Sequence, residues 1–259
     1  MNTIIRLKSW GVMSLVLLST SCALFGGNSG PTKAERMESL SRIKTQLAIE
    51  YMGAQDYRAA VAAIDEAIEA DRRFDYAWMI KGLIYQTLKV NDKADQAYRQ
   101  ALSISPNSAE INNNYGWFVC DGMQQPAQSL QYFDRALADP TYPTPQTAQM
   151  NKGICEARSG HFASAAANLA RTRALAPWFA PAIKEMARLK LMEGQTPQAT
   201  DLFNEYQSKV EILSPDDLLL GLKISRARGD TQAAYEYEAQ LRTRYPSSDE
   251  ARQLGTGGY

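Results

Sequence analysis

Small and aromatic residues recur along this chain at a spacing of about thirty-four residues between Arg42 and Pro246. The clearest copy of the pattern runs from Asp75 to Ser108 and predicts two antiparallel helices joined by a turn. Its recurring positions hold Trp78, Gly82, Tyr85, Ala94, Tyr98, Ala101 and Pro106.

The residue types explain how such a pair of helices would pack. Gly82 and Ala94 are small, so the two helices of the unit can approach closely. Trp78, Tyr85 and Tyr98 then fill the space between the helices and their neighbours. The repeated pattern therefore predicts one continuous core along the chain, with no separate second domain.

The same register extends to both sides of this copy, with one extra residue expected in the turn of the third copy. The pattern resembles the tetratricopeptide repeat. We therefore expect an all-α, right-handed superhelix of about six tetratricopeptide (TPR) repeats over residues 41–246, followed by a C-terminal tail over 247–259. The further copies are marked by Ala48, Ala60 and Ile64, then Gly116, Ser129 and Phe133, then Gly153, Ala165 and Leu169, then Ala187, Ala199 and Phe203, and finally Gly221, Ala233 and Tyr237.

The N-terminus has the composition of an export signal. Arg6 and Lys8 precede an apolar run, and small residues lead to Cys22. The segment resembles the lipobox of bacterial lipoproteins, which predicts a signal peptide over 1–21, lipidation of Cys22, and a lipidated, flexible tether over 22–40. Ala23 in the next position implies the outer membrane, periplasmic face. Cleavage at a non-lipid site is the alternative, because Ser19 stands where such boxes usually carry leucine.

Composition argues against several classes of function. Lys plus Arg and Asp plus Glu each number 28, so the chain lacks the basic excess that nucleic-acid binding requires. His161 is the one histidine, and the cysteines form no Cys-x-x-Cys pair. Nucleophilic catalysis and zinc binding would both need partners that the sequence does not offer. We expect no enzymatic activity, cofactor, metal or nucleic-acid partner.

Cys120 and Cys155 fall late in the first helices of the third and fourth repeats, which would pack side by side. An oxidising periplasm permits a disulfide between them. The alternative is two small, buried thiols.

The first helix of each TPR unit is expected to line the concave surface. Counting the inward positions predicts an apolar partner-binding groove suited to a hydrophobic segment or an amphipathic helix. Met79 and Leu83 are as compatible with the core as with the groove, since a phase error of one residue rotates a helix by about a hundred degrees. The groove residues expected are Ile49, Met52, Tyr76, Met79, Leu83, Asn113, Trp117 and Met150.

Three stretches carry a more specific resemblance: Asn113-Asn114-Tyr115-Gly116, Leu218-Leu219-Leu220-Gly221 and Leu241 to Ser247. Together with the leader and the repeats, they resemble the PilW/PilF family of type IV pilus biogenesis and stability lipoproteins. The resemblance implies a pilotin, an outer-membrane lipoprotein that helps the pilus secretin to reach that membrane and to form multimers. It supplies no catalytic residues. The alternative is a TPR lipoprotein scaffold that serves another envelope complex, in outer-membrane protein assembly or with peptidoglycan enzymes.

Overall fold

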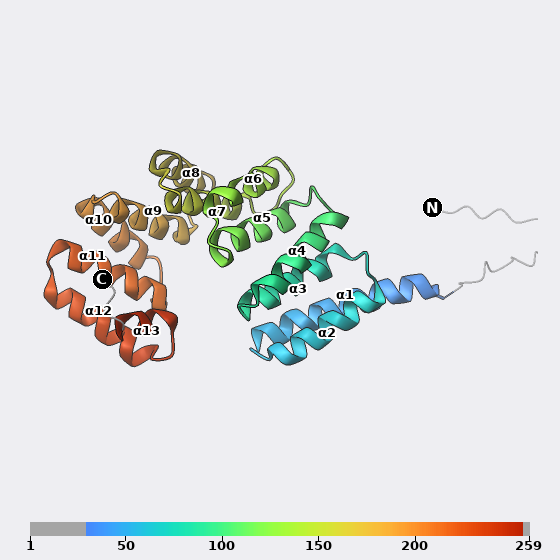
Figure 1. The fold of residues 1–259 in the computed structure, drawn as a ribbon. Helices are drawn as coiled ribbons and strands as arrows, with labels where there is room; N and C mark the ends of the chain where they lie inside the picture. Colours follow the sequence, from blue (N-terminus) through green and yellow to red (C-terminus); the bar gives the residue numbers. More distant parts are fainter. Residues whose placement is uncertain (1–29, 256–259) are drawn as a thin grey trace, which may run out of the picture.

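Helices occupy most of the chain that the computed structural model describes, residues 30–255 (Figure 1). That range contains thirteen α-helices and one π-helical turn, and no β-strand. The helices pair in sequence and follow one another around an arch, which confirms the prediction of an all-α TPR superhelix. Within the same residues, no helix combines the length and hydropathy that a membrane crossing requires.

The first helices of the six units line the inner side of the arch over much of its length, and the second helices cover its outer side (Figure 1). The first helices are α1 (Lys33–Gly53), α3 (Asp75–Thr87), α5 (Ala109–Trp117), α7 (Pro145–Arg158), α9 (Ala180–Met192) and α11 (Pro215–Arg228). The second helices are α2 (Tyr57–Ala70), α4 (Asn91–Ile104), α6 (Pro126–Leu137), α8 (Phe162–Leu175), α10 (Thr196–Gln207) and α12 (Thr231–Arg244). The π-helical turn η1 (Phe118–Gly122) prolongs α5, and α13 (Asp249–Gly255) ends the described chain.

The two ends of the arch are more ordered than the sequence predicted. Helix α1 begins at Lys33, inside the range 22–40 that was expected to be a tether. The Thr32 hydroxyl accepts a hydrogen bond from the Glu35 amide (3.2 Å), and the Thr32 amide donates one to the Glu35 carboxylate (2.6 Å). This capping box satisfies two amides at the start of the helix. The predicted tail likewise contains α13, whose Ala251 packs against α11 and α12.

The sequence predicted that the extra residue of the third repeat would lengthen the turn between its two helices. The structure shows a turn of ordinary length instead. The extra residue is accommodated inside the first helix, where the backbone widens into η1 directly after Trp117. A π-helical turn is the usual consequence of one inserted residue in an α-helix. The widening lies directly beside Trp117, one of the residues predicted to line the groove.

Each unit is held together where a small residue of the first helix meets a large side chain of the second. A Cβ atom placed on Gly82 would lie 2.8 Å from the ring of Tyr98. Gly153 faces Leu169 in the fourth unit in the same way, and Gly221 faces Tyr237 in the sixth. The sequence prediction that small residues permit close helix contact is therefore confirmed at these positions.

The Gly82→Ala variant is expected to lower the free energy of unfolding by about 2 kcal/mol, because the added methyl group overpacks a core with no room for it. Urea unfolding followed by circular dichroism measures the change. Gly53→Ala is the matched control: its added Cβ atom meets nothing within 4 Å, so stability should stay equal or rise. Equal effects of the two variants would contradict the role given to the Gly82 contact.

Candidate partner-binding groove

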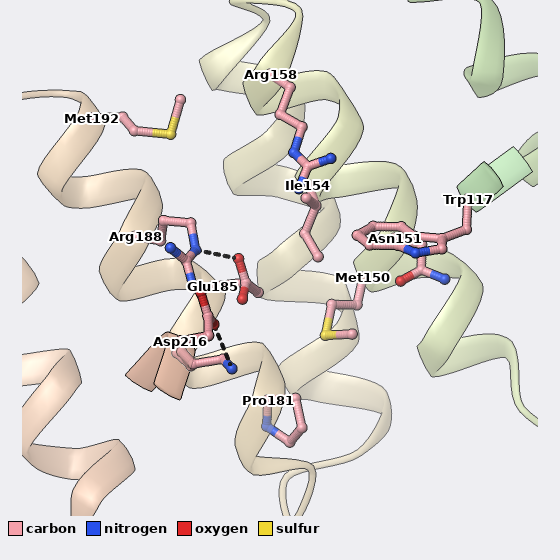
Figure 2. Close-up of a pocket in the computed structure, with 11 residues that line it drawn as sticks. Trp117, Met150, Asn151, Ile154, Arg158, Pro181, Glu185, Arg188, Met192 and Asp216 are labelled. Atoms are coloured by element: carbon pink, nitrogen blue, oxygen red, sulfur yellow. Dashed lines mark hydrogen bonds and ion pairs between the residues drawn. The ribbon is translucent and has the colours of Figure 1, made fainter. Parts of the chain in front are cut away.

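A cavity of about 520 Å³ opens on the inner side of the arch, where the first helices of the third to sixth units converge (Figure 2). Trp117 of α5 forms one wall. Met150 and Ile154 of α7 form the middle, and Pro181 and Met192 of α9 lie at the opposite side. The apolar lining suits the side chains of a hydrophobic or amphipathic segment.

The Trp117 side chain is held in place from two directions. Its ring extends towards Met150 and Ile154, and the Arg158 guanidinium lies 5.3 Å from the ring centroid (Figure 2). Arg158 in turn forms an ion pair of 2.7 Å with Asp121 in η1. The cation and the aromatic face attract each other, so Arg158 orients the largest apolar group of the cavity.

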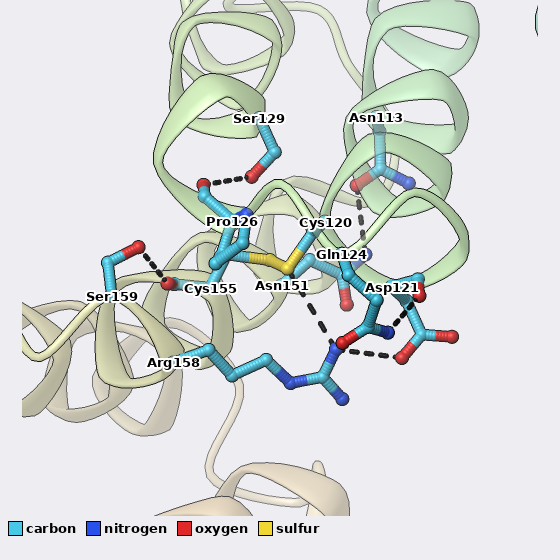
Figure 3. The surroundings of a disulfide bond; sticks show 10 residues. All are labelled: Asn113, Cys120, Asp121, Gln124, Pro126, Ser129, Asn151, Cys155, Arg158 and Ser159. Atoms are coloured by element: carbon cyan, nitrogen blue, oxygen red, sulfur yellow. Dashed lines mark hydrogen bonds and ion pairs between the residues drawn. A yellow bond between two sulfur atoms is a disulfide. The ribbon is translucent and has the colours of Figure 1, made fainter.

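A disulfide lies directly behind this wall. The structure joins Cys120 in η1 to Cys155 in α7, with the Cα atoms 6.0 Å apart (Figure 3). Cys120 follows Trp117 by three residues, and Cys155 follows Ile154 by one. The bridge therefore fixes the separation of the two helices that carry the apolar wall of the cavity.

Paired charges form the C-terminal part of the cavity. Lys184 and Arg188 of α9 both contact Asp216 of α11, at 3.0 and 2.7 Å, and Arg188 also contacts Glu185 at 3.0 Å. Lys184 lies 2.9 Å from the buried Asp217 as well. These pairs tie the fifth unit to the sixth.

The pKa values of this cluster follow the balance between burial and the facing charges. Burial disfavours the charged form of Lys184, but the nearby Asp216 and Asp217 outweigh that effect and raise the pKa of Lys184. Burial by itself would raise the pKa of Asp216, yet Arg188 and Lys184 lower it. All these groups are therefore charged at neutral pH and neutralise one another, so they leave little net charge for a ligand.

Two of the eight predicted groove residues, Trp117 and Met150, line the cavity. Asn113 was expected to contact a partner but is 7% exposed, and its side-chain oxygen accepts a hydrogen bond of 3.1 Å from Asn151. Asn151 itself lines the cavity, so Asn113 supports the lining from behind.

The remaining predicted residues belong to the first two units and lie outside this cavity. Met79 is 3% exposed and belongs to the core, which corrects its assignment to the groove and follows the alternative left open by its helical phase. Ile49, Met52 and Tyr76 are half-buried and pack against that core. Leu83 is half-buried on α3. Cys22 lies outside the described residues.

The charged half of the cavity was missed by sequence reasoning, although a signal was present. In the fifth repeat, the inward positions of the same register are Pro181, Lys184, Arg188 and Leu191, and the first three of these line the cavity. The partner of both cations, Asp216, follows no repeat position and could be found only from the packing of α9 against α11.

The arrangement of paired helices that follow one another around an arch defines a TPR protein. The Tetratricopeptide repeat family model matches residues 45–109 and 122–177. A crystal structure of PilW, a widely conserved type IV pilus biogenesis factor, is 57% identical, with a TM-score of 0.73, and the match covers 83% of this chain and 97% of that one. The chain belongs to the PilW family of type IV pilus biogenesis proteins.

A more distant relative agrees along nearly the whole length. The type IV pilus assembly protein PilF of Pseudomonas aeruginosa is 25% identical over 247 residues, which cover 94% of this chain and 96% of PilF. A solved PilF structure from Pseudomonas aeruginosa has a TM-score of 0.66 at 23% identity, covers 85% of this chain and 99% of its own, and shows the shared fold.

Replacing Asp216 by asparagine is expected to lower the free energy of unfolding by about 1–2 kcal/mol at neutral pH. Lys184 and Arg188 lose a shared carboxylate, and partial exposure of Asp216 keeps the loss below that of a fully buried pair. The pKa of Asp216 is lower in the folded protein than in the unfolded chain. Its contribution to the free energy of unfolding is therefore present above the usual carboxyl pKa range and is lost as the pH falls through the lowered pKa.

The difference between wild type and Asp216→Asn, measured by urea unfolding, should therefore shrink as the pH falls through the lowered pKa of Asp216. Asp134→Asn is the matched control, because its pair with Lys152 at 2.6 Å leaves the aspartate 60% exposed. That variant should cost less than about 0.5 kcal/mol. A pH-independent cost for Asp216→Asn would rule out the proposed charge balance.

Reduction of the disulfide is expected to lower the free energy of unfolding by about 2–4 kcal/mol, because the bridge closes a loop of intermediate length. The two residues are separated by 35 positions. Unfolding with and without a reductant measures the change. In the Cys120→Ser, Cys155→Ser double variant the reductant should have no effect. A wild type that is equally insensitive would show that the thiols are free.

Proposed function

We propose that this protein is a pilotin of the type IV pilus system, a non-enzymatic lipoprotein that binds the pilus secretin and promotes its localisation and multimerisation in the outer membrane. The observation that carries this proposal is the cavity with an apolar wall at Trp117, Met150 and Ile154, in a chain that is 57% identical to PilW. The family membership supplies the pilus context, and the cavity supplies a surface on which an envelope partner can bind.

Binding would use apolar contact rather than net charge. A segment that buries about 200 Å² of apolar surface in the cavity gains about 5 kcal/mol from transfer out of water. The charges that line the cavity are already engaged in ion pairs within the protein. The affinity should therefore change little with salt, unlike the affinity of an electrostatic clamp.

The groove would protect the secretin until its multimer is complete. An apolar segment of a subunit that awaits assembly risks aggregation, and a groove that covers the segment removes that surface from water. The disulfide behind Trp117 supports this role, because it holds the two apolar walls at a fixed separation and lowers the cost of ordering the site on binding.

The lipid anchor on Cys22 would place this groove at the membrane. About ten residues separate Cys22 from Thr32, where the first capping box begins, and an extended segment of that length reaches about 35 Å. The groove could thus meet a partner close to the periplasmic face of the outer membrane. Both the lipidation and the location belong to the proposal.

A scaffold role accords with the placement of the polar residues. The side chain of His161 is exposed at the start of α8, and the acidic residues of the cavity serve as partners of Lys184 and Arg188. Among residues 30–255, no three side chains of histidine, cysteine, aspartate or glutamate gather in a way that could hold a metal ion.

The test is the state of the secretin in outer-membrane fractions, resolved as heat-resistant multimer or as monomer. Cells that lack the protein and cells with Trp117→Ala or Ile154→Asp should lose most of the multimer, because truncation of a buried aromatic anchor weakens binding by about thirtyfold. Tyr235→Ala is the control, since that aromatic ring is 71% exposed on α12.

Circular dichroism of each purified variant shows whether the fold is retained. A normal multimer in the deletion strain would contradict the pilotin proposal and leave a scaffold for another envelope complex. A lost multimer in the deletion strain, with a normal multimer in both folded groove variants, would keep the pilotin role but move the binding site elsewhere.

A further inference from the structure

The outer face of α8 differs from the outer faces of the other second helices. Four alanines, Ala163, Ala167, Ala170 and Ala174, are exposed there, in a row that faces away from the first helices. Charged and amide side chains cover the equivalent surfaces elsewhere, for example Arg58, Glu66 and Glu69 on α2, and Asp92, Lys93, Gln96 and Arg99 on α4. Helix α8 lies on the outer side of the arch, opposite the groove (Figure 1).

The apolar surface continues past the end of α8 into the following turn. Leu175 is 52% exposed, and Trp178 is 76% exposed, more than any other large apolar side chain in residues 30–255. We call the four alanines, Leu175 and Trp178, with Arg171 among them, the α8 face. A row of methyl groups allows the backbone of a second helix to approach closely, and tryptophan and arginine are the residues that most often dominate binding energy at interfaces.

Arg171 is the one charged residue of the α8 face. It stands three and four positions from Ala174 and Ala167, so it lies between them on the helix surface. No ion pair or hydrogen bond of its side chain occurs with any residue in the range 30–255. Its neighbour Arg173, in contrast, contacts Glu205 of α10 at 2.9 Å. A ligand of the α8 face would meet an unpaired positive charge near its centre.

The position of Arg171 argues against a second copy of this chain as the occupant. The face runs from Ala163 to Trp178, and its midpoint falls between Ala170 and Arg171. In an antiparallel two-fold contact between two α8 helices that is centred on this midpoint, Arg171 would lie close to its own copy. Two like charges directly opposite each other are unfavourable. A carboxylate at that point on another protein would instead complete an ion pair.

A lipid surface is also a poorer fit than a helix. Helices that lie on membranes present bulky apolar residues on one side and several lysines or arginines on the other. The α8 face has mostly methyl groups, which gain little from burial in lipid, and a single unpaired cation. Its shape favours close backbone contact over insertion.

We propose that the α8 face is a second interaction surface, which docks an amphipathic helix of a partner protein by packing it on the alanine row, with Trp178 as an anchor at one end and a partner carboxylate on Arg171. This surface is separate from the groove and does not depend on the secretin proposal. With both surfaces occupied, the protein would hold one partner inside the arch and another outside it.

The test uses the purified protein and two fluorescein-labelled helical peptides of about fifteen residues, stabilised by a side-chain lactam. Both present a leucine and alanine stripe and differ only in a central glutamate or lysine. Fluorescence anisotropy should show the glutamate peptide binding about tenfold more tightly, because one ion pair forms and one repulsion is avoided. Arg171→Glu should reverse the preference.

Variants of the packing surface separate this site from nonspecific binding. Ala167→Glu should weaken both peptides at least tenfold by blocking close approach, and Trp178→Ala should weaken them about tenfold. Ala62→Glu is the matched control, an exposed alanine on the outer face of α2, and should change neither affinity. Trp117→Ala in the groove should likewise leave both affinities unchanged. A negative result for the α8 face can therefore be told apart from a negative result for the groove.

Several results would overturn the inference. One is equal affinity for the two peptides, or no binding of either up to about 1 mM. Another is dimerisation in analytical ultracentrifugation that Ala167→Glu abolishes, which would make the occupant a second copy. The third is binding to phosphatidylglycerol vesicles that is lost in Trp178→Ala while neither peptide binds, which would make it a lipid surface.

Discussion

The fold depends on one recurring contact, in which a glycine of the first helix lies against a large side chain of the second. At Gly82, Gly153 and Gly221 there is no space for even one further methyl group. The contact sets how closely the two helices of a unit pack, and therefore how each unit offers its surface to the next. Every unit has a small residue at this position, which is alanine in the first and fifth units (Ala48 and Ala187) and glycine in the others. The angle between units therefore accumulates into an arch with an inner and an outer side. The groove exists because of that curvature.

Within this scaffold, the middle of the arch is reinforced more strongly than a generic repeat would be. The π-helical turn after Trp117 and the Cys120–Cys155 bridge both fall where the third unit meets the fourth. The ion pairs of Lys184 and Arg188 then join the fifth unit to the sixth. The apolar part of the cavity lies between these two fixed points. Rigid support of this kind reduces the entropy that is lost when a segment binds.

The ends of the arch rely on weaker interactions. Lys89 in the turn after α3 reaches Asp249 of α13 with an ion pair of 2.7 Å across 160 positions in sequence, but both side chains are mostly exposed. Such a pair contributes little to stability. This pair therefore does little to fix the separation of the two ends.

The sequence by itself determined the helix pairs, their close contacts at glycine, the family and the proximity of the two cysteines, because each depends on residue type at a fixed spacing. It also contains signals for two features that were not predicted: the capping box at Thr32 and Glu35, and the inward register of the fifth repeat. Only the tertiary structure decided that Met79 and Asn113 are buried while Trp117 and Met150 line a cavity. That choice depends on the rotation of each helix and on the angle between units, which arise from packing among units and are not encoded at any single position.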